Sequence, residues 1–424
     1  MSMCNAKNEI FLLTLGIIIS SIGLVSSLTL VLELKASSDM VSDSTHLTNQ
    51  SLLIDFDDTL NLSDNTEDSV YGQVSSSDNK IYVVWQESVP GNIDRNYEIF
   101  FKKSSDRGNS FGEKIRLSNN TGFSEHPQMS AESKNVYVVW ADDTKLNKQI
   151  YFKKSDNGGN SFGEQMLLSD SNSNSYNQEI SSFGDNVYIV WLEKIPNGPY
   201  QIMLTNSNDG GNTFSEPIVL SENAMAQTFP KVSAFDSHIY VTWNVEDQAN
   251  VKSGVYFISS IDNGMTFGNA SKLNNEEKDF GEPQVASYAN QVYVIWGGSE
   301  TNMLRSLSFI KSNDYGKTFS NIKKIGETEL GRLNEPSNVE IIADQNNRVF
   351  ISWQDRMDIS HKDEIFFASS TDRGESFNGV MNLSNNLDIS ECPSIIAVDD
   401  MVYATWEDLT PGNHEVLFSR GTIL

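Results

Sequence analysis

One eight-residue pattern, S-x-D-x-G-x-S/T-F, recurs six times along this chain of 424 residues. The copies begin at residues 104, 155, 207, 260, 312 and 370, so successive copies lie 51, 52, 53, 52 and 58 residues apart. Ser, Asp and Asn side chains hydrogen-bond to nearby backbone groups, and Gly adopts positive φ at little cost. Each octet therefore predicts a tight turn between two β-strands, with its closing Phe packed beneath the turn.

The third residue of each octet is predicted to be structural. The second copy carries Asn where the others carry Asp, which keeps the hydrogen-bonding capacity and loses the charge. This exchange argues against a catalytic role and favours stabilisation of the turn. The six positions are Asp106, Asn157, Asp209, Asp262, Asp314 and Asp372.

All seven tryptophans belong to a longer repeat. Each Trp ends a short run with the alternation of a β-strand, as in 81–85 (IYVVW) and 402–406 (VYATW). A second strand follows a polar stretch, a third follows the octet, and a fourth opens the next repeat. Four short strands in every ~50 residues predict the blades of a β-propeller.

Seven Trp strands predict seven blades, although there are only six octets. The seventh unit ends without an octet or a third strand. The segment 58–65 (DTLNLSDN) matches 113–120 (EKIRLSNN), and the two segments lie equally far before Trp85 and Trp140. We therefore expect a strand at 60–63 to complete the seventh blade and to close the ring.

The predicted fold is all-β: a seven-bladed β-propeller of four-stranded blades over residues 58–424, closed by an N-terminal strand. The octet resembles the Asp-box, also called the BNR repeat, of the sialidase superfamily, and the resemblance covers the same residues. It implies that the octets lie on the face of the propeller away from the functional site.

The resemblance also implies candidate catalytic residues. Sialidases of this superfamily have six blades and use an arginine triad for the substrate carboxylate, a Tyr–Glu nucleophile pair and an Asp acid. The F/Y-R-I-P motif that precedes the first Asp-box in that family is absent here, and no spacing identifies an arginine triad. The candidates on the face opposite the octets are Arg305, Arg332 and Arg356 for a carboxylate clamp, Asp94 as the acid, and Tyr176 or Tyr200 as the nucleophile.

Residues 10–32 contain no charged side chain and are long enough, at ~20 residues, to cross a bilayer. We expect an uncleaved transmembrane anchor, with residues 1–9 on the cytoplasmic side and residues 33–57 as a flexible, polar stalk. The alternative is a signal peptide cleaved near residues 25–27. The propeller is thus expected outside the cell, held at the membrane by a single span or secreted.

The chain has 57 acidic and 30 basic residues and a net charge of −27, which argues against nucleic acid as a partner. Acids follow five of the tryptophans by two residues, and others precede the Pro of four inner strands. They could bind a ligand at the mouth of the central channel or supply a glycosidase acid/base pair; the alternative is strand-end hydrogen bonding and solubility. These acids are Glu87, Asp142, Glu193, Asp355 and Asp408, and Glu125, Glu282, Glu335 and Glu391.

The only candidate cofactor is Ca²⁺, held by Glu282 and Glu335, because Ca²⁺ prefers several oxygen ligands. Two functions remain open. The first is a cell-surface propeller that binds a glycan or a protein through the face opposite the octets. The second is a sialidase-like exo-glycoside hydrolase that acts on acidic sugars.

Overall fold

The computed structural model describes residues 53–90, 96–169, 172–224, 229–245, 253–274, 281–299, 305–325, 333, 336–356 and 362–424. Every element within these ranges is a β-strand. The apolar segment 10–32 lies outside them, as does most of the predicted stalk. No helix in the described part of the chain is long and apolar enough to cross a membrane.

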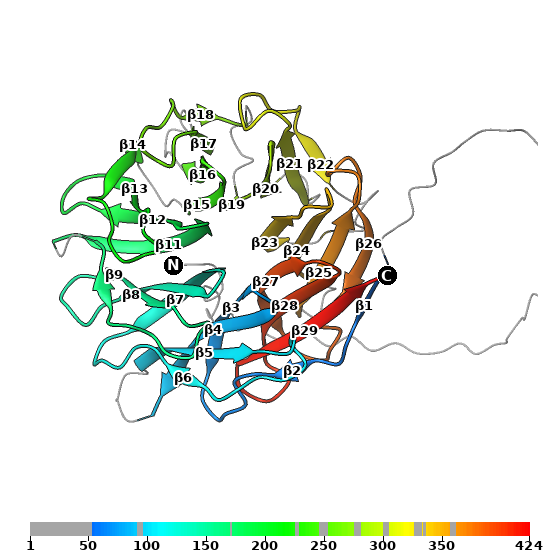
Figure 1. Ribbon diagram of the computed structural model, residues 1–424. Coiled ribbons are helices and arrows are strands. Elements are labelled where there is room, and N and C mark those ends of the chain that lie inside the picture. The colour runs from blue at the N-terminus through cyan, green and yellow to red at the C-terminus, as the bar shows by residue number, and fades with distance from the viewer. Residues whose placement is uncertain are drawn as a thin grey trace, which may run out of the picture. The chain divides into compact units, whose positions relative to one another are not determined.

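Seven antiparallel sheets stand around a central axis, and each is one blade of a β-propeller (Figure 1). The predicted count of seven four-stranded blades is confirmed. In chain order the first three blades contain β3 (Ser69–Ser77), β4 (Lys80–Val89), β5 (Asn96–Ser104) and β6 (Ile115–Arg116); β7 (Ser124–Glu132), β8 (Asn135–Asp142), β9 (Gln149–Ser155) and β10 (Met166–Leu167); and β11 (Asn174–Phe183), β12 (Asn186–Lys194), β13 (Tyr200–Ser207) and β14 (Ile218–Ala224).

The remaining blades repeat this arrangement, and the last blade takes its outer strands from the start of the propeller. They contain β15 (Lys231–Phe235), β16 (His238–Val245), β17 (Gly254–Ser260) and β18 (Ser271–Lys272); β19 (Pro283–Tyr288), β20 (Gln291–Ser299), β21 (Arg305–Ser312) and β22 (Lys323–Ile325); β23 (Ser337–Ala343), β24 (Val349–Arg356), β25 (Asp363–Ser370) and β26 (Asn378–Asn382); and β27 (Ser390–Val398), β28 (Met401–Asp408), β29 (Glu415–Ile423), β1 (Ile54–Phe56) and β2 (Leu60–Asn61).

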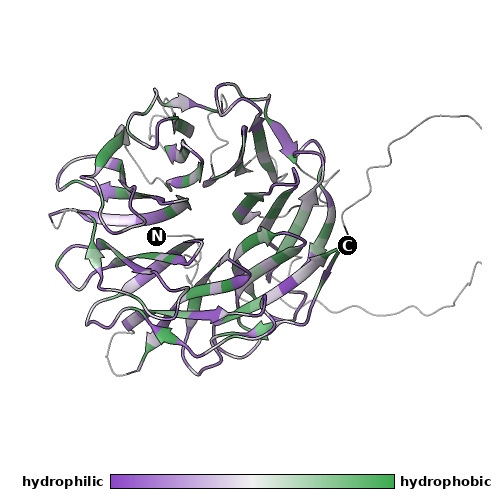
Figure 2. Cartoon of the chain, viewed as in Figure 1, coloured by the Kyte–Doolittle hydropathy of each residue, from purple (hydrophilic) through white to green (hydrophobic). Residues whose placement is uncertain are grey.

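The second strand of each blade carries the Trp run and forms the core of the molecule. Val83, Val84 and Trp85 of β4 are fully buried, because both faces of the blade pack against neighbouring blades. Figure 2 shows hydrophobic residues in the strands and hydrophilic residues along most connecting loops. The strand nearest the axis in Figure 1 is the first of each blade, here called the inner strand.

Each octet forms the turn between the third and fourth strands of a blade, as Asp209 illustrates. Its Oδ1 accepts hydrogen bonds from Ser207 Oγ (2.7 Å) and the N–H of Thr213 (2.9 Å), and its Oδ2 accepts from Thr213 Oγ1 (2.7 Å). In the second octet, Asn157 Oδ1 accepts from the N–H of Ser161 (3.1 Å), and its Nδ2 donates to Ser161 Oγ (2.8 Å). Asn thus reproduces the contacts of Asp, as expected of a turn-stabilising side chain.

The closing Phe of an octet packs against the third strand of the preceding blade. Phe162 meets Phe101 edge-on, with ring centroids 5.0 Å apart. The octet glycine packs against the same Phe101 side chain. Gly159 has φ +73°, and a Cβ at this position would come within 2.7 Å of the Phe101 ring. Four further pairs have this edge-on geometry, namely Phe111–Phe418, Phe214–Phe152, Phe319–Phe257 and Phe377–Phe309.

The predicted closing strand is confirmed, because β2 pairs with β29 through Leu60↔Phe418 and Asn61↔Leu417. The structure also extends the closure into the segment that the sequence predicted as stalk, since β1 pairs antiparallel with the end of β29. The short, alternating run Ile-Asp-Phe of β1 places Ile54 in the core.

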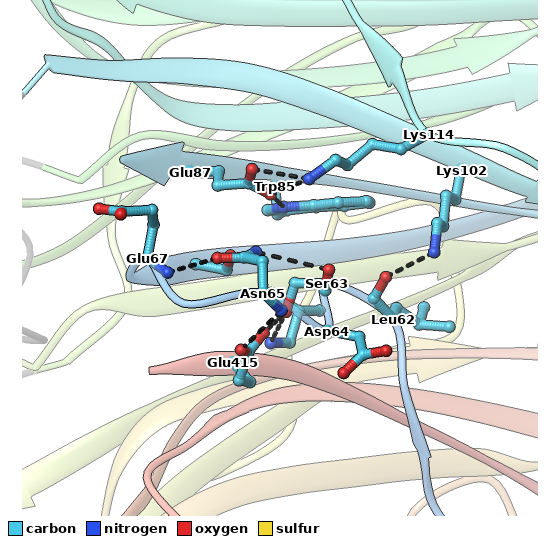
Figure 3. A network of polar contacts seen from close by, with 12 residues as sticks. Leu62, Ser63, Asp64, Asn65, Glu67, Trp85, Glu87, Lys102, Lys114 and Glu415 are labelled. Atoms are coloured by element: carbon cyan, nitrogen blue, oxygen red, sulfur yellow. Dashed lines mark hydrogen bonds and ion pairs between the residues drawn. The ribbon is translucent and has the colours of Figure 1, made fainter. Parts of the chain in front are cut away.

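Polar contacts reinforce this closure (Figure 3). The Glu415 side chain accepts hydrogen bonds from Ser63 Oγ and from the N–H of Asn65, the latter at 3.0 Å. Lys102 Nζ of blade 1 donates to the carbonyl oxygen of Leu62 at 2.8 Å. The closing segment is therefore bonded to blades 7 and 1.

Candidate functional site at the channel mouth

The candidate site is the face on which the Trp strands end, opposite the octet turns. Since each inner strand runs antiparallel to its Trp strand, the inner strands begin on this face. The mouth face is therefore made of the starts of the inner strands, the ends of the Trp strands and the loops that follow them.

Three of the five acids that follow a Trp accept a hydrogen bond from the indole of that Trp. Glu87 Oε2 accepts from Trp85 Nε1 at 3.1 Å, and Lys114 Nζ binds the same carboxylate at 2.7 Å (Figure 3). The other two pairs are Trp191–Glu193 at 3.2 Å and Trp406–Asp408 at 3.1 Å.

Asp142 and Asp355 have other partners. Asp142 accepts from Ser124 Oγ (2.7 Å) and from the N–H of Thr144 (2.9 Å), and Asp355 Oδ1 accepts from the N–H of Arg356 (2.7 Å). All five acids are buried. Their contacts match the alternative of strand-end hydrogen bonding, and their role in ligand binding stays a prediction.

The acids that precede the inner strands are placed differently. Glu125 forms an ion pair with Lys148. Glu391 accepts from Gln354 Nε2 at 3.3 Å, and burial together with the neighbouring Asp363 raises the pKa of Glu391 to about 7.

Glu282 is the acid with an unsatisfied oxygen: its Oε1 is buried and has no hydrogen-bond partner among the described residues. Burial raises the pKa of Glu282. Glu335 lies outside the described residues. Within the described ranges no three His, Cys, Asp or Glu side chains are grouped so as to hold a metal ion, so the Ca²⁺ site at Glu282 and Glu335 stays a prediction.

A ring of polar residues on the inner strands was not anticipated from the sequence. Each blade contributes the inner-strand residue whose backbone pairs with the position directly before the Trp. We call these residues the axial ring: Gln73, Gln128, Glu179, Lys231, Gln284, Glu340 and Ser394. The register of inner strand against Trp strand is the signal that could have identified them.

The axial ring carries a charged residue type in blades 3, 4 and 6, and blade 5 between them contributes Gln284. Lys231 Nζ donates to Glu179 Oε2 at 2.6 Å, and Gln284 Nε2 donates to Glu340 Oε1 at 3.5 Å. Burial raises the pKa of Glu340 to about 7 despite the attraction of Lys231, and Glu179 and Glu282 add to the increase. Although burial opposes it, the same carboxylates raise the pKa of Lys231. One ammonium group thus faces three carboxyl groups.

Five inner strands contain a β-bulge near the mouth. The bulge of each places one non-glycine residue at positive φ, a conformation that persists where surrounding contacts enforce it. These residues are Tyr71, His126, Asn177, Asn338 and Cys392, with φ values of 57°, 53°, 50°, 46° and 52°. No sequence pattern marks them. The Tyr71 and His126 rings meet edge-on at 4.4 Å, and burial lowers the pKa of His126 to about 4.

Two tyrosines on the mouth face are each covered by a lysine. Lys148 Nζ lies 5.9 Å from the ring centroid of Tyr176, and Lys194 Nζ lies 4.2 Å from that of Tyr200. Tyr176 and Tyr200 pack in the same hydrophobic cluster and remain partly exposed. We call these four residues the tyrosine–lysine patch. It combines aromatic surface with ammonium groups, which suits the faces and polar groups of a sugar.

The predicted catalytic residues are only partly described. Arg356 Nε lies 3.4 Å from Asp363 Oδ1, so this guanidinium is paired within its own blade. Arg305 begins β21, while Arg332 and Asp94 lie outside the described residues. Burial raises the pKa of Tyr176, which keeps its phenol protonated at neutral pH. The carboxylate clamp and the nucleophile therefore stay predictions.

Comparison with known proteins returned similar folds. The chain resembles a protein of unknown function from Dyadobacter fermentans with a TM-score of 0.54 and 16% identity, over 88% of this chain and 99% of that one. Trypanosoma rangeli sialidase, as a mutant displaying trans-sialidase activity, has a TM-score of 0.48 and 11% identity, over 88% of this chain and 57% of that one. The NanB sialidase of Streptococcus pneumoniae has a TM-score of 0.48 and 10% identity, over 87% and 70%.

No protein-family model and no curated protein matches the sequence. At the identities above, likeness concerns the fold alone. The ring of seven four-stranded blades defines the class of protein: a seven-bladed β-propeller, whose six octet turns resemble the Asp-box in sequence. Since a fold of this kind supports many functions, the function has to be argued from the site.

Proposed function

We propose that the propeller is an exported, membrane-anchored binding module that recognises a glycan through the tyrosine–lysine patch on its mouth face. The observation that carries this proposal is the placement of Lys148 and Lys194 against the rings of Tyr176 and Tyr200. Aromatic rings pack on the C–H faces of pyranoses, and ammonium groups donate hydrogen bonds to hydroxyl and carboxylate oxygens.

Binding is favoured over hydrolysis because four of the mouth carboxylates are already engaged in contacts within the propeller. Glu87, Glu193 and Asp408 are committed to indole N–H groups, and Glu125 is paired with Lys148. A general acid needs a free position beside the glycosidic oxygen. Three of these carboxylates instead bond the ends of their Trp strands, and Glu125 holds Lys148 of the patch.

A glycan array tests the proposal. The protein should bind glycans that contain acidic sugars, and Tyr200→Ala and Lys194→Met should each weaken that binding by about tenfold or more, in line with losses of ~1.4 kcal/mol. Tyr315→Ala is the matched control, because Tyr315 is a partly exposed tyrosine on an octet turn. Unchanged binding by both mouth-face variants would contradict the proposal.

The second candidate is a sialidase-like exo-glycoside hydrolase, favoured by the octets and by the cluster of Arg356, Asp363 and Glu391 on blades 6 and 7. It predicts turnover of fluorogenic sialosides that is lost in Arg305→Ala, Arg332→Ala or Arg356→Ala. Turnover with this dependence would replace the binding proposal. Export and anchoring are tested separately by locating the intact protein in the membrane fraction and by sequencing its N-terminus.

A further inference from the structure

Three junctions between blades are bonded by the same device. At the blade 1–2 junction, Gln86 Oε1 accepts a hydrogen bond from the N–H of His126 at 2.6 Å. At the blade 6–7 junction, Gln354 Oε1 accepts from the N–H of Cys392 at 3.3 Å. In both cases the acceptor directly follows a Trp, and the donor is the positive-φ residue in the inner-strand bulge of the next blade. We call the acceptor the latch residue.

The third latch lies where the ring closes, and its residue is a glutamate. Glu407 directly follows Trp406 of blade 7, and its Oε1 accepts from the N–H of Tyr71 of blade 1 at 2.7 Å. Tyr71 has φ 57°, in the bulge equivalent to those of His126 and Cys392. A carboxyl group therefore occupies the position that carboxamides occupy at the other two junctions.

The surroundings of Glu407 disfavour ionisation of its side chain, because the side chain is buried beside another glutamate. Glu407 is 3% exposed, and Glu391 on β27 is its direct cross-strand partner. Side chains of directly opposed residues lie on the same face of a sheet with Cβ atoms ~5 Å apart, where like charges repel. Further titratable groups near Glu407 are His414, whose Nδ1 lies 3.9 Å from Oε2, and Tyr71, whose ring packs against that of His126. Asp363 lies beyond Glu391 and adds negative charge.

We propose that Glu407 is a proton-operated latch at the closing junction: protonated Glu407 bonds blade 7 to blade 1 without a buried charge, whereas ionised Glu407 still accepts the Tyr71 N–H but destabilises the junction through its burial and its repulsion by Glu391. A protonated carboxyl has the shape and the acceptor oxygen of a glutamine side chain, together with one donor. Protonated Glu407 thus reproduces Gln86 and Gln354. Ionised Glu407 brings a buried charge against Glu391 at the junction that closes the propeller.

The direction of the titration agrees with this geometry. Burial raises the pKa of Glu407 to about 8, with a further contribution from Glu391 and an opposing one from the Tyr71 N–H. Because the pKa is raised on folding, the contribution to stability is present below the ordinary pKa of 4.5 and is lost as the pH rises through about 8. The stability of the folded protein should therefore fall progressively as the pH rises from about 4.5 to about 8.

The test compares thermal unfolding of the wild type and Glu407→Gln between about pH 5 and about pH 9. The melting temperature of the wild type should fall with rising pH by at least about 2 °C more than that of Glu407→Gln. Amide exchange at Tyr71, corrected for the intrinsic rate, should accelerate with pH in the wild type but not in the variant. Glu164→Gln is the charge control, because Glu164 is exposed on an octet-side link, and it should follow the wild type.

Gln86→Glu should transfer the pH dependence of the Glu407 latch to the blade 1–2 junction. Gln86 is 4% exposed, so the introduced carboxyl should create a new loss of stability at alkaline pH together with faster exchange at His126. Parallel pH profiles of the wild type and Glu407→Gln would overturn the proposal. Failure of Glu407→Gln to fold would overturn it as well, since this variant is expected to imitate the protonated state.

Discussion

Phe56 packs edge-on against Phe367, with ring centroids 5.8 Å apart and an interplanar angle of 75°. Phe367 belongs to the third strand of blade 6, the strand position that octet phenylalanines contact in other blades. Blade 7 has no octet, and the N-terminal strand β1 supplies the missing ring. The strand that closes the sheet of blade 7 thus also restores the aromatic contact between blades 6 and 7.

Phe56→Ala should therefore destabilise the propeller although Phe56 precedes the first repeat. Loss of a half-buried aromatic ring and of its edge-on contact is expected to lower the free energy of unfolding by about 2–3 kcal/mol. Chemical denaturation followed by tryptophan fluorescence measures this difference. Phe111→Ala, which removes the equivalent contact with Phe418, should cost a similar amount. A neutral Phe56→Ala beside a costly Phe111→Ala would show that β1 does not close the ring.

Two substitutions of an octet Asp should distinguish how much of its contribution to stability comes from hydrogen bonding and how much from its charge. Asp209→Ala removes the acceptor for the Thr213 N–H and should lower the free energy of unfolding by about 1 kcal/mol. Asp209→Asn should cost less, because Asn157 makes equivalent contacts in the second octet. Equal losses from both substitutions would show that the charge matters as well. Glycan binding by the folded protein should be unchanged in both.

The octets should also contribute to acid sensitivity. Hydrogen bonds from Ser and Thr side chains and from backbone N–H groups lower the pKa of Asp106 and Asp209 to about 2. A lowered pKa means that the stabilisation is present above the ordinary value of 3.8 and is lost as the pH falls through about 2. Asp209→Asn should therefore lose less stability than the wild type as the pH falls from 3.8 to about 2. Acid unfolding followed by circular dichroism measures this difference.

Lys231 should stabilise the axial ring in a pH-dependent way. Lys231→Met leaves Glu179, Glu282 and Glu340 without their cation and should cost about 2–3 kcal/mol at neutral pH. Glu340 becomes protonated as the pH falls from about 7 toward 4.5, so the loss should shrink over this span. A loss that is independent of pH would show that packing, and not charge, accounts for the effect.

The excess of carboxyl groups around Lys231 also predicts a preference for a divalent cation. Calcium should raise the melting temperature more than sodium at matched ionic strength, because specific binding stabilises by mass action while sodium only screens. Glu282→Gln should abolish the difference. Equal shifts from the two salts would contradict a Ca²⁺ site at Glu282 and Glu335.

The sequence by itself determined the repeat and therefore the architecture. Octets and Trp runs are local signals: turn residues and strand alternation act within a few positions, so strand number and blade number follow from counting them. The match of 58–65 to 113–120 likewise predicted closure by β2. The run Ile54–Phe56 is too short to signal a strand, and it was expected in the stalk.

Only the tertiary structure decided which side chains meet at the axis and at the mouth. The axial ring depends on pairing between the inner strands and the Trp strands, and a β-bulge shifts that register by an amount no local pattern records. The contact of Lys148 with Tyr176 joins blades 2 and 3, and that of Glu407 with Tyr71 joins the last blade to the first across 336 residues of chain. Burial and charge at such contacts arise from blade packing, because the same glutamate would titrate normally in the unfolded chain.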